Sequence, residues 1–290
     1  MKGAIYTAEK KNARTPNSVG SSRIRGTWLM RYWPELTEYM IGGEYEFCIF
    51  QKAWHKQLIC GDVGLENGFE GIKIFDSCDP DWLEREDAFE FYNACDAVTC
   101  STKALQHYIQ MLLPDKIVKY IPDRVDLEEH KNVKATHRKK LTDLVWFGYS
   151  HNFHYIQKSL PVLKKHGIRL TVYSDTAIQL GNADDRLFEW RKYDYERLHD
   201  ELIRFDAAIF SSEREKVDHR GRFKSPNKQI TCKALGIPVI HNEKELKLMM
   251  DVEARKKAAK AGRKWVEEEM DVKQSVVEYK KLIEEIKSVK

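Results

Sequence analysis

Three carboxylates follow a short apolar run in the first third of the sequence. The run covers residues 72–75, Asp76 comes directly after it, and Asp79 and Asp81 stand on either side of a proline. A carboxylate at the end of a buried strand can accept a proton from a hydroxyl group. The spacing therefore predicts Asp76 and Asp79 as candidate general bases, with helix capping by Asp79 as the structural alternative.

A second segment could bind an anion. The run Lys224-Ser225-Pro226-Asn227-Lys228 precedes a helical pattern that ends at Gly236. Serine is a favoured N-cap, proline is favoured at the first helical position, and the free N–H groups of a helix start attract phosphate. With Ser225 as the N-cap, Lys224 and Lys228 would flank that start. The segment predicts a phosphate or diphosphate site, unless it is a plain capped surface helix.

The same reasoning applies near the beginning of the sequence. Ser22 can cap a helix that includes Trp28, and Arg23 and Arg25 then lie beside the helix start. We expect these arginines to bind a phosphate or an anionic acceptor, or otherwise to be solvated at the surface. His55 follows another buried run and is a second candidate for a base or an acceptor contact, with a structural histidine as the alternative.

These residues belong to a chain in which short buried runs alternate with helical patterns. Residues 45–51, 72–75, 97–100 and 118–121 are predicted strands. The alternation starts again at 144–147 after a basic stretch and continues with a predicted helix at 153–165. Such alternation favours parallel sheets, whose ligands bind beyond the carboxyl ends of the strands. We therefore predict an α/β protein with two Rossmann-like, doubly wound domains facing a cleft. The expected parts are residues 1–125, a linker at 126–140, residues 141–272 and an amphipathic closing helix at 273–290.

Composition agrees with this division. The chain has 290 residues, of which 42% are hydrophobic and 32% are charged, which suits two globular domains and excludes a disordered chain. The sequence lacks a membrane-spanning apolar run and a signal-peptide core, so we expect a soluble, cytoplasmic protein. The six cysteines lack the spacing of a zinc site, and we expect reduced thiols and no metal. The net charge is only +4, but basic residues gather at 1–31, 131–140 and 214–228, which suggests anionic ligands.

Five segments in order resemble GT-B fold glycosyltransferases of the GT4-like group (glycosyl transferases group 1). The main match is to the donor-binding segment of that group, with residues 224–228 followed by Ala234-Leu235-Gly236-Ile237-Pro238-Val239-Ile240. The other matching segments are Ser21 to Arg25, Cys95 to Ser101, Ile121 to Asp126 and Trp146 to Ser150. The resemblance therefore extends from residue 21 to residue 240.

The resemblance implies transfer of a sugar from a nucleotide-diphospho-sugar, such as a UDP- or GDP-sugar, to a hydroxyl acceptor. It implies a retaining, metal-independent reaction without a tightly bound cofactor, in which Lys224 neutralises the leaving diphosphate. GT4-like enzymes usually carry a glutamate pair, and Phe223 and Thr231 stand at those positions here. The implied donor-binding residues, in the second domain, are Gly148, Tyr149, Ser174, Trp190, Tyr193, Lys224, Ser225, Asn227 and Lys228. Of these, Trp190 and Tyr193 are expected in a loop after a middle strand.

Two other functions stay open at this point. Compact GT-B proteins of this length also resemble phage-encoded transferases that glycosylate hydroxymethylated DNA bases, and such binding would depend steeply on salt. The missing glutamate pair instead allows a glycosyltransferase-like protein that binds a nucleotide or a glycan without turnover. The acceptor is accordingly a glycan, a small molecule or modified DNA.

Overall fold

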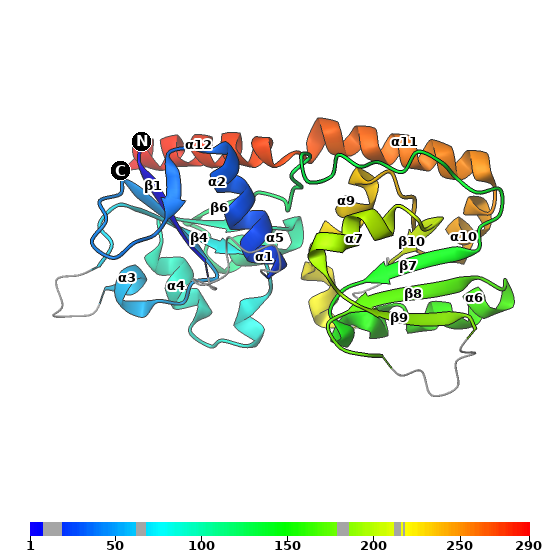
Figure 1. Ribbon diagram of the computed structural model, residues 1–290. Coiled ribbons are helices and arrows are strands. Elements are labelled where there is room, and N and C mark those ends of the chain that lie inside the picture. Colours follow the sequence, from blue (N-terminus) through cyan, green and yellow to red (C-terminus); the bar gives the residue numbers. More distant parts are fainter. Residues whose placement is uncertain (8–18, 62–67, 179–185, 212–215, 217) are drawn as a thin grey trace. The chain divides into compact units, whose positions relative to one another are not determined.

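The chain forms two units (Figure 1). The computed structural model describes residues 1–7, 19–61, 68–178, 186–211, 216 and 218–290. Unit 1 comprises Met1–Asp126, Arg222–Ser225 and Asp271–Lys290, and unit 2 comprises Leu127–Gly221 and Pro226–Met270. Each unit contains one parallel sheet with helices, so the predicted α/β class with two Rossmann-like domains is confirmed. Residues 222–225 differ from the expected division, because they belong to unit 1.

Unit 1 is built on a six-stranded sheet in the order β2-β1-β3-β4-β5-β6. Neighbouring strands in this sheet are parallel. Every residue of β3 and β5 is buried, as expected for inner strands of a parallel sheet covered on both faces. The strands are β1 (Gly3–Thr7), β2 (Leu36–Glu38), β3 (Phe47–Gln51), β4 (Ile72–Ser77), β5 (Ala97–Cys100) and β6 (Ile117–Tyr120).

The helical segment after β1 has three parts. It consists of α1 (Gly20–Ser22), a π-helical turn (Arg23–Thr27) and α2 (Trp28–Tyr32). A π-helical turn inside a helix occurs frequently at functional sites. The other helices among the described residues of Met1–Asp126 are α3 (Lys56–Cys60), the 3-10 helix η2 (Asp81–Leu83), α4 (Ala88–Ala94) and α5 (Lys103–Leu112).

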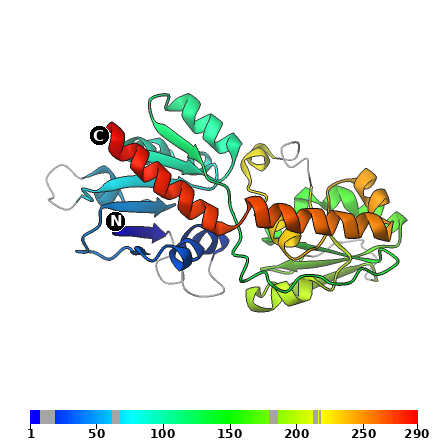
Figure 2. The ribbon, with the colours of Figure 1, turned by 90° about the horizontal axis from the view of Figure 1, so that it is seen from above.

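The C-terminal helix α12 (Val272–Val289) completes unit 1. Figures 1 and 2 show it in red beside α2, against which it packs. Asp271 caps the helix by accepting a hydrogen bond from the backbone N–H of Lys273. One apolar stripe at helical spacing is buried, as the sequence predicts for an amphipathic helix. That stripe consists of Val272, Val276, Tyr279, Leu282, Ile283 and Ile286.

Unit 2 is built on a five-stranded parallel sheet in the order β11-β10-β7-β8-β9. Its strands are β7 (Asp143–Phe147), β8 (Arg169–Ser174), β9 (Phe188–Lys192), β10 (Ala207–Ile209) and β11 (Val239–Ile240). Its α-helices are α6 (Leu160–Lys165), α7 (Tyr195–Leu202), α9 (Asn227–Ala234), α10 (Glu243–Met249) and α11 (Val252–Glu269). The 3-10 helix η5 (His219–Phe223) runs from unit 2 into the segment that belongs to unit 1.

Two segments of unit 2 differ from the sequence-based expectation. The helical pattern at 153–165 forms the 3-10 helices η3 (Ser150–Tyr155) and η4 (Gln157–Ser159) before α6 begins. Pro161 explains the break, because proline suits the first turn of α6 but would disrupt a continuous helix. Trp190, expected in a loop, lies in strand β9.

Two further features of the described residues bear on the expected class. No helix among them is long and apolar enough to cross a membrane. The six cysteines are free thiols, and Cys60 is the one that is not fully buried. Burial of a thiol away from charges makes it a small apolar core residue.

Removal of a buried side chain from α12 tests whether this helix is part of the core of unit 1. Ile283 is fully buried in α12. We expect Ile283→Ala to lower the free energy of unfolding by about 2–5 kcal/mol, because it leaves a cavity. Urea denaturation measures the loss, and Lys281→Ala at an exposed position of the same helix is the matched control. A loss no larger than that of the control would contradict the assignment.

Candidate functional site

The carboxyl ends of the strands of unit 1 place several polar residues at one edge of the sheet. Strand β1 pairs with β2 on one side and with β3 on the other, so the chain changes direction between β1 and β3. Ligands of doubly wound sheets bind at such a switch point. Lys52 follows β3 directly, Asp76 is the fifth residue of β4, and Asp79 and Asp81 come after that strand.

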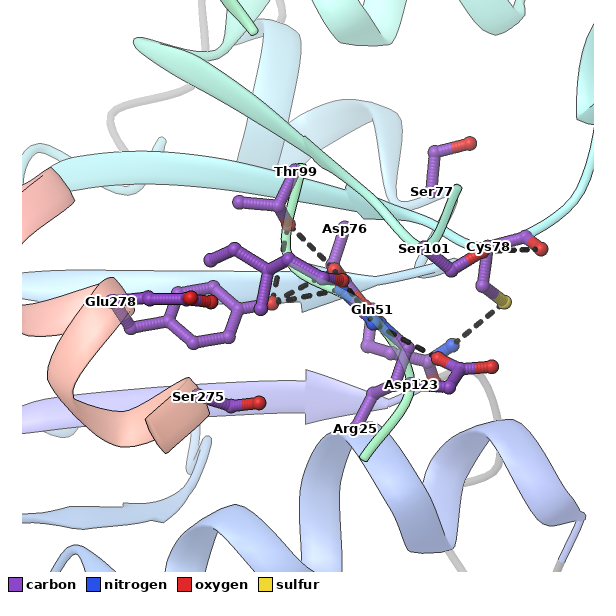
Figure 3. A network of polar contacts seen from close by, with 12 residues as sticks. Arg25, Gln51, Asp76, Ser77, Cys78, Thr99, Ser101, Asp123, Ser275 and Glu278 are labelled. Atoms are coloured by element: carbon purple, nitrogen blue, oxygen red, sulfur yellow. Dashed lines mark hydrogen bonds and ion pairs between the residues drawn. The ribbon is translucent and has the colours of Figure 1, made fainter. Parts of the chain in front are cut away.

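A buried ion pair lies inside this edge (Figure 3). The guanidinium of Arg25 donates to both carboxylate oxygens of Asp76, with an Nε–Oδ2 distance of 2.6 Å, and a second nitrogen donates to Asp123 at 3.0 Å. The hydroxyl groups of Thr99 and Tyr279 also donate to Asp76, the latter at 2.8 Å. Burial raises the pKa of Asp123, although Arg25 opposes this effect.

This network corrects two expectations from the sequence. Asp76 is fully buried and both of its oxygens accept hydrogen bonds, so it is a structural carboxylate and not an accessible general base. Arg25 is also buried and is committed to Asp76 and Asp123, so it does not face an anionic acceptor. The sequence could not reveal this pairing, because the partners are 51 and 98 residues apart.

A second charged cluster is partly open to solvent. Lys52 Nζ lies 2.9 Å from Asp79 Oδ2 and 3.0 Å from Asp81 Oδ1, and Lys224 Nζ lies 3.5 Å from Asp79 Oδ1. The Asp79 side chain is 36% exposed, whereas that of Asp81 is 7% exposed. Among the described residues, Asp81 Oδ2 is a buried oxygen without a hydrogen-bond partner. Asp79 is therefore the carboxylate of this cluster that a ligand can reach.

The electrostatics of the two carboxylates differ. Burial favours a raised pKa at Asp79, but the ammonium groups of Lys52 and Lys224 outweigh it and lower the pKa below its usual value. At Asp81 burial dominates over Lys52 and raises the pKa to about 6. Asp79 is consequently ionised at neutral pH and can accept a hydrogen bond from a hydroxyl group.

The segment that carries Lys224 is fixed within unit 1. Phe223 is buried, and its ring packs edge to face on Trp82 and Tyr108 at centroid distances of 5.3 and 5.7 Å. The side chain of Ser225 lies beside Asp123, where it helps to lower the pKa of that carboxyl against the effect of burial. Lys224 and Ser225 thus contact unit 1 and lie outside the unit that contains α9.

The start of α9 therefore differs from the expectation. The helix begins at Asn227 with Pro226 as its N-cap, and among the described residues no side chain caps it. Ser225, the expected cap, lies one residue before the N-cap Pro226, with its side chain beside Asp123. Of the two lysines expected to flank the helix start, Lys228 lies in its first turn.

Ser22, Arg23 and His55 also have structural partners. Ser22 does not cap a helix, because it lies at the end of α1 and its hydroxyl donates to Gln51 Oε1 at 3.4 Å. Arg23 is buried, with its guanidinium carbon 6.0 Å from the centre of the Trp28 ring. His55 caps α3, since its Nδ1 accepts a hydrogen bond from the backbone N–H of Leu58 at 3.3 Å.

In unit 2, Gly148 and Lys228 lie side by side. Gly148 follows β7, and its N–H donates to the carbonyl of Tyr173 at 3.0 Å. A Cβ atom at Gly148 would lie 3.0 Å from Lys228 Cε and 3.1 Å from the ring of Trp146. The glycine therefore leaves room for the side chain of Lys228, which stands in the first turn of α9.

Three other predicted donor residues meet at the ends of β8 and β9. Trp190 Nε1 donates to the hydroxyl of Ser174 at 2.9 Å, and that hydroxyl donates to the carbonyl of Thr176. The backbone N–H of Tyr193 donates to the carbonyl of Ser174 at 2.9 Å. Tyr149 is 46% exposed, and its ring stacks on His151. Ser174 is thus internally bonded, whereas Tyr149 has an accessible ring.

Unit 2 also contains a cavity of about 230 Å³ beside β10 and β11. Its walls include the apolar side chains of Leu163, Ile240 and Leu246 and the polar side chains of Lys158 and His241. None of the predicted donor residues, all of which are described, lines this cavity. It carries no part of the proposed chemistry.

Sequence reasoning missed Lys52. Lys52 stands directly after the buried strand β3, which is the same signal that singles out Asp76 after the preceding apolar run. Applied to every strand, that criterion would have found it. In the part of the chain that the structure describes, no group of three His, Cys, Asp or Glu residues is placed to hold a metal ion.

Comparisons with known proteins identify the class of fold. No family model and no curated protein matches the sequence. Solved structures do match, and they give the chain the two-domain GT-B fold of glycosyltransferases. At identities of 8–11% this likeness concerns the fold.

The individual structures differ in length. Sucrose-phosphate synthase from Thermosynechococcus elongatus matches with a TM-score of 0.68 and 10% identity over 100% of both chains. A glycosyltransferase from Rickettsia africae matches with a TM-score of 0.59 and 8% identity over 98% of both chains. TarM matches with a TM-score of 0.62 and 11% identity, over 82% of this chain and 54% of its own, so this chain spans about half of TarM.

The Asp81 carboxyl generates a testable pH dependence of stability. Burial raises the pKa of Asp81 to about 6 in the folded protein, above the value of about 3.9 in an unfolded chain. Because the folded state then binds the proton more tightly, this group lowers the free energy of unfolding by about 3 kcal/mol as the pH rises from about 4 to about 6. Asp81→Asn should remove that decrease, which urea unfolding at successive pH values measures.

Asp79→Asn is the control with the opposite sign. The pKa of Asp79 is lowered in the folded state, so its contribution is present above the unfolded pKa and is lost as the pH falls through the folded pKa. An Asp81→Asn protein that loses stability between pH 4 and 6 as the wild type does would show that Asp81 does not hold the raised pKa.

Proposed function

We propose that this protein transfers a sugar from a nucleotide-diphospho-sugar, a UDP- or GDP-sugar, to a hydroxyl group of an acceptor. The observation that carries the proposal is the edge of unit 2 where Gly148 lies against Lys228, a residue of the first turn of α9. Backbone N–H groups at a helix start and an ammonium group together suit a diphosphate.

The fold of similar structures supports the same class of donor. A TarM variant from S. aureus, with a TM-score of 0.56 and 10% identity to this chain, was solved with fondaparinux, α-GlcNAc-glycerol and UDP. In this chain the nucleoside is assigned to the ends of β8 and β9, where Ser174, Trp190 and Tyr193 meet, and to the exposed ring of Tyr149. An aromatic ring with one accessible face suits a nucleobase.

The proposed reaction is retaining and needs no metal ion. The bond between the anomeric carbon and the diphosphate oxygen breaks, the acceptor oxygen bonds to that carbon, and the acceptor proton passes to the departing diphosphate. Lys228 and the N–H groups of α9 stabilise the negative charge that develops on the leaving group. In unit 1, Asp79 accepts a hydrogen bond from a hydroxyl group of the acceptor other than the attacking one, and Lys224 is engaged with Asp79 instead of with the diphosphate.

Nucleotide binding tests the donor site. We expect one of UDP, GDP, ADP or CDP, or its sugar conjugate, to raise the melting temperature of the protein, because a ligand that binds only the folded state stabilises it. Lys228→Ala should abolish most of that shift. Lys257→Ala, at an exposed position of α11 in the same unit, is the matched control. Equal shifts in both variants would exclude Lys228 from the donor site.

The acceptor site is tested by kinetics of Asp79→Asn. Loss of a hydrogen bond to a charged group costs about 1.5–3 kcal/mol, so we expect the acceptor KM to rise about tenfold or more. In the retaining reaction kcat should fall by less than about a hundredfold. A larger fall in kcat would contradict retention and would make Asp79 the base of an inverting reaction. Asp87→Asn, in an exposed surface pair with Arg85, is the control.

One observation favours a second candidate function, binding of a nucleotide or glycan without turnover. Phe223 stands where GT4-like enzymes usually have a glutamate, and it is buried against Trp82 and Tyr108. That position therefore cannot contact a donor sugar. A thermal shift with a nucleotide, together with no release of nucleoside diphosphate from any sugar conjugate, would support this function over transfer.

A further inference from the structure

We propose that Lys52 is a positioning residue of the acceptor site, whose ammonium group holds the Asp79 carboxylate in place to accept a hydrogen bond from a hydroxyl group of the acceptor. This inference rests on the proposed function. It assigns a role to a residue that lies directly after β3 and that the resemblance to GT4-like enzymes does not include.

The backbone of Lys52 is the first observation. Its φ angle is +46°, and among the described residues it is the one non-glycine residue with a positive φ. The left-handed conformation costs an L-residue about 1–2 kcal/mol, so it persists where surrounding contacts impose it. Its N–H donates to the carbonyl of Asp76 at 3.2 Å, which ties the strained residue to the end of β4. A glycine would relieve the strain but would supply no ammonium group.

The contacts of the ammonium group are the second observation. Lys52 Nζ lies 2.9 Å from Asp79 and 3.0 Å from Asp81, so it bridges the two carboxylates. Asp81 is almost completely buried and anchors the lysine from inside the fold. Asp79 contacts Lys52 through one oxygen and Lys224 through the other. Both orientation and charge of Asp79 are thus fixed before an acceptor arrives.

The exposure of the cluster is the third observation. The side chains of Lys52 and Asp79 are 24% and 36% exposed, so the pair is accessible although its anchor is buried. A carboxylate oxygen can accept more than one hydrogen bond, and Asp79 therefore retains capacity for a hydroxyl donor. The arrangement resembles a preorganised hydrogen-bond acceptor held by a supporting residue.

The other charged groups near Lys52 and Asp79 determine how removal of the Lys52 charge would change the pKa of Asp79. Asp79 faces Lys224, Asp81 and the Cys78 thiol, and Cys78 in turn lies near Asp76 and Asp123. Lys224 would be the remaining cation on Asp79, at the longer distance of 3.5 Å. Loss of the nearer cation raises the pKa of Asp79, because the ionised form loses its stronger partner.

The test compares Lys52→Gln, which keeps hydrogen-bonding atoms but removes the charge, with Lys52→Arg, which restores it. Lys56→Gln is the matched control, because Lys56 is 69% exposed and pairs with Glu90 at 3.5 Å. The first readout is the pH titration of the Asp79 carboxyl carbon by NMR, assigned with Asp79→Asn. We expect the midpoint to rise by about one pH unit in Lys52→Gln and to stay near the wild-type value in the other two variants.

The second readout is sugar transfer. We expect Lys52→Gln to raise the acceptor KM about tenfold, to leave the donor KM unchanged, and to displace the acidic limb of the pH profile upward, with rescue by Lys52→Arg. An unchanged midpoint of the Asp79 titration in Lys52→Gln would overturn the proposal. A raised midpoint with an unchanged acceptor KM and an unchanged pH profile would also overturn it. A moved titration in a protein that transfers no sugar would overturn the proposed function, while confirming that Lys52 sets the charge of Asp79.

Discussion

The buried ion pair between Arg25 and Asp76 is the constraint on which the edge of unit 1 depends. Two fully buried charges are tolerated only when each is paired and hydrogen-bonded, and here the carboxylate also accepts from Tyr279 and Thr99. These contacts join the helix after β1, two strands and the C-terminal helix. Because Asp76 is fixed in this way, the chain that leaves β4 places Asp79 and Asp81 beside Lys52.

The environments of Asp76 and Asp79 at this edge give the two carboxylates different roles. Asp76 satisfies a buried arginine and has no accessible oxygen, whereas Asp79 keeps part of its side chain exposed between two lysines. A short distance along the chain thus separates a structural carboxylate from one that can meet a ligand. The segment with Phe223 contributes to this division, because its buried ring fixes the position of Lys224 beside Asp79.

In unit 2 the candidate donor edge depends on the small size of Gly148 and on the backbone groups at the start of α9. Gly148 allows a close approach to Lys228, where any larger residue would meet the lysine stem and the Trp146 ring. Trp190 donates to the hydroxyl of Ser174, which in turn donates to the carbonyl of Thr176, and these hydrogen bonds order the ends of β8 and β9. The edge therefore combines the backbone N–H groups at the start of α9 with the Lys228 cation in its first turn.

The sequence by itself determined the α/β class, the two parallel sheets and most strand positions, because strand–helix periodicity is a local signal that reports burial directly. It also located the residues after β4 and β7. Only the tertiary structure decided which of them are accessible: Asp76 and Arg25 pair across 51 residues, Ser225 lies beside Asp123 instead of capping α9, and Lys52 bridges Asp79 and Asp81. Burial and charge pairing between distant segments produce no periodic pattern in the sequence. They are therefore visible only in the tertiary structure, where the sheet brings those segments together.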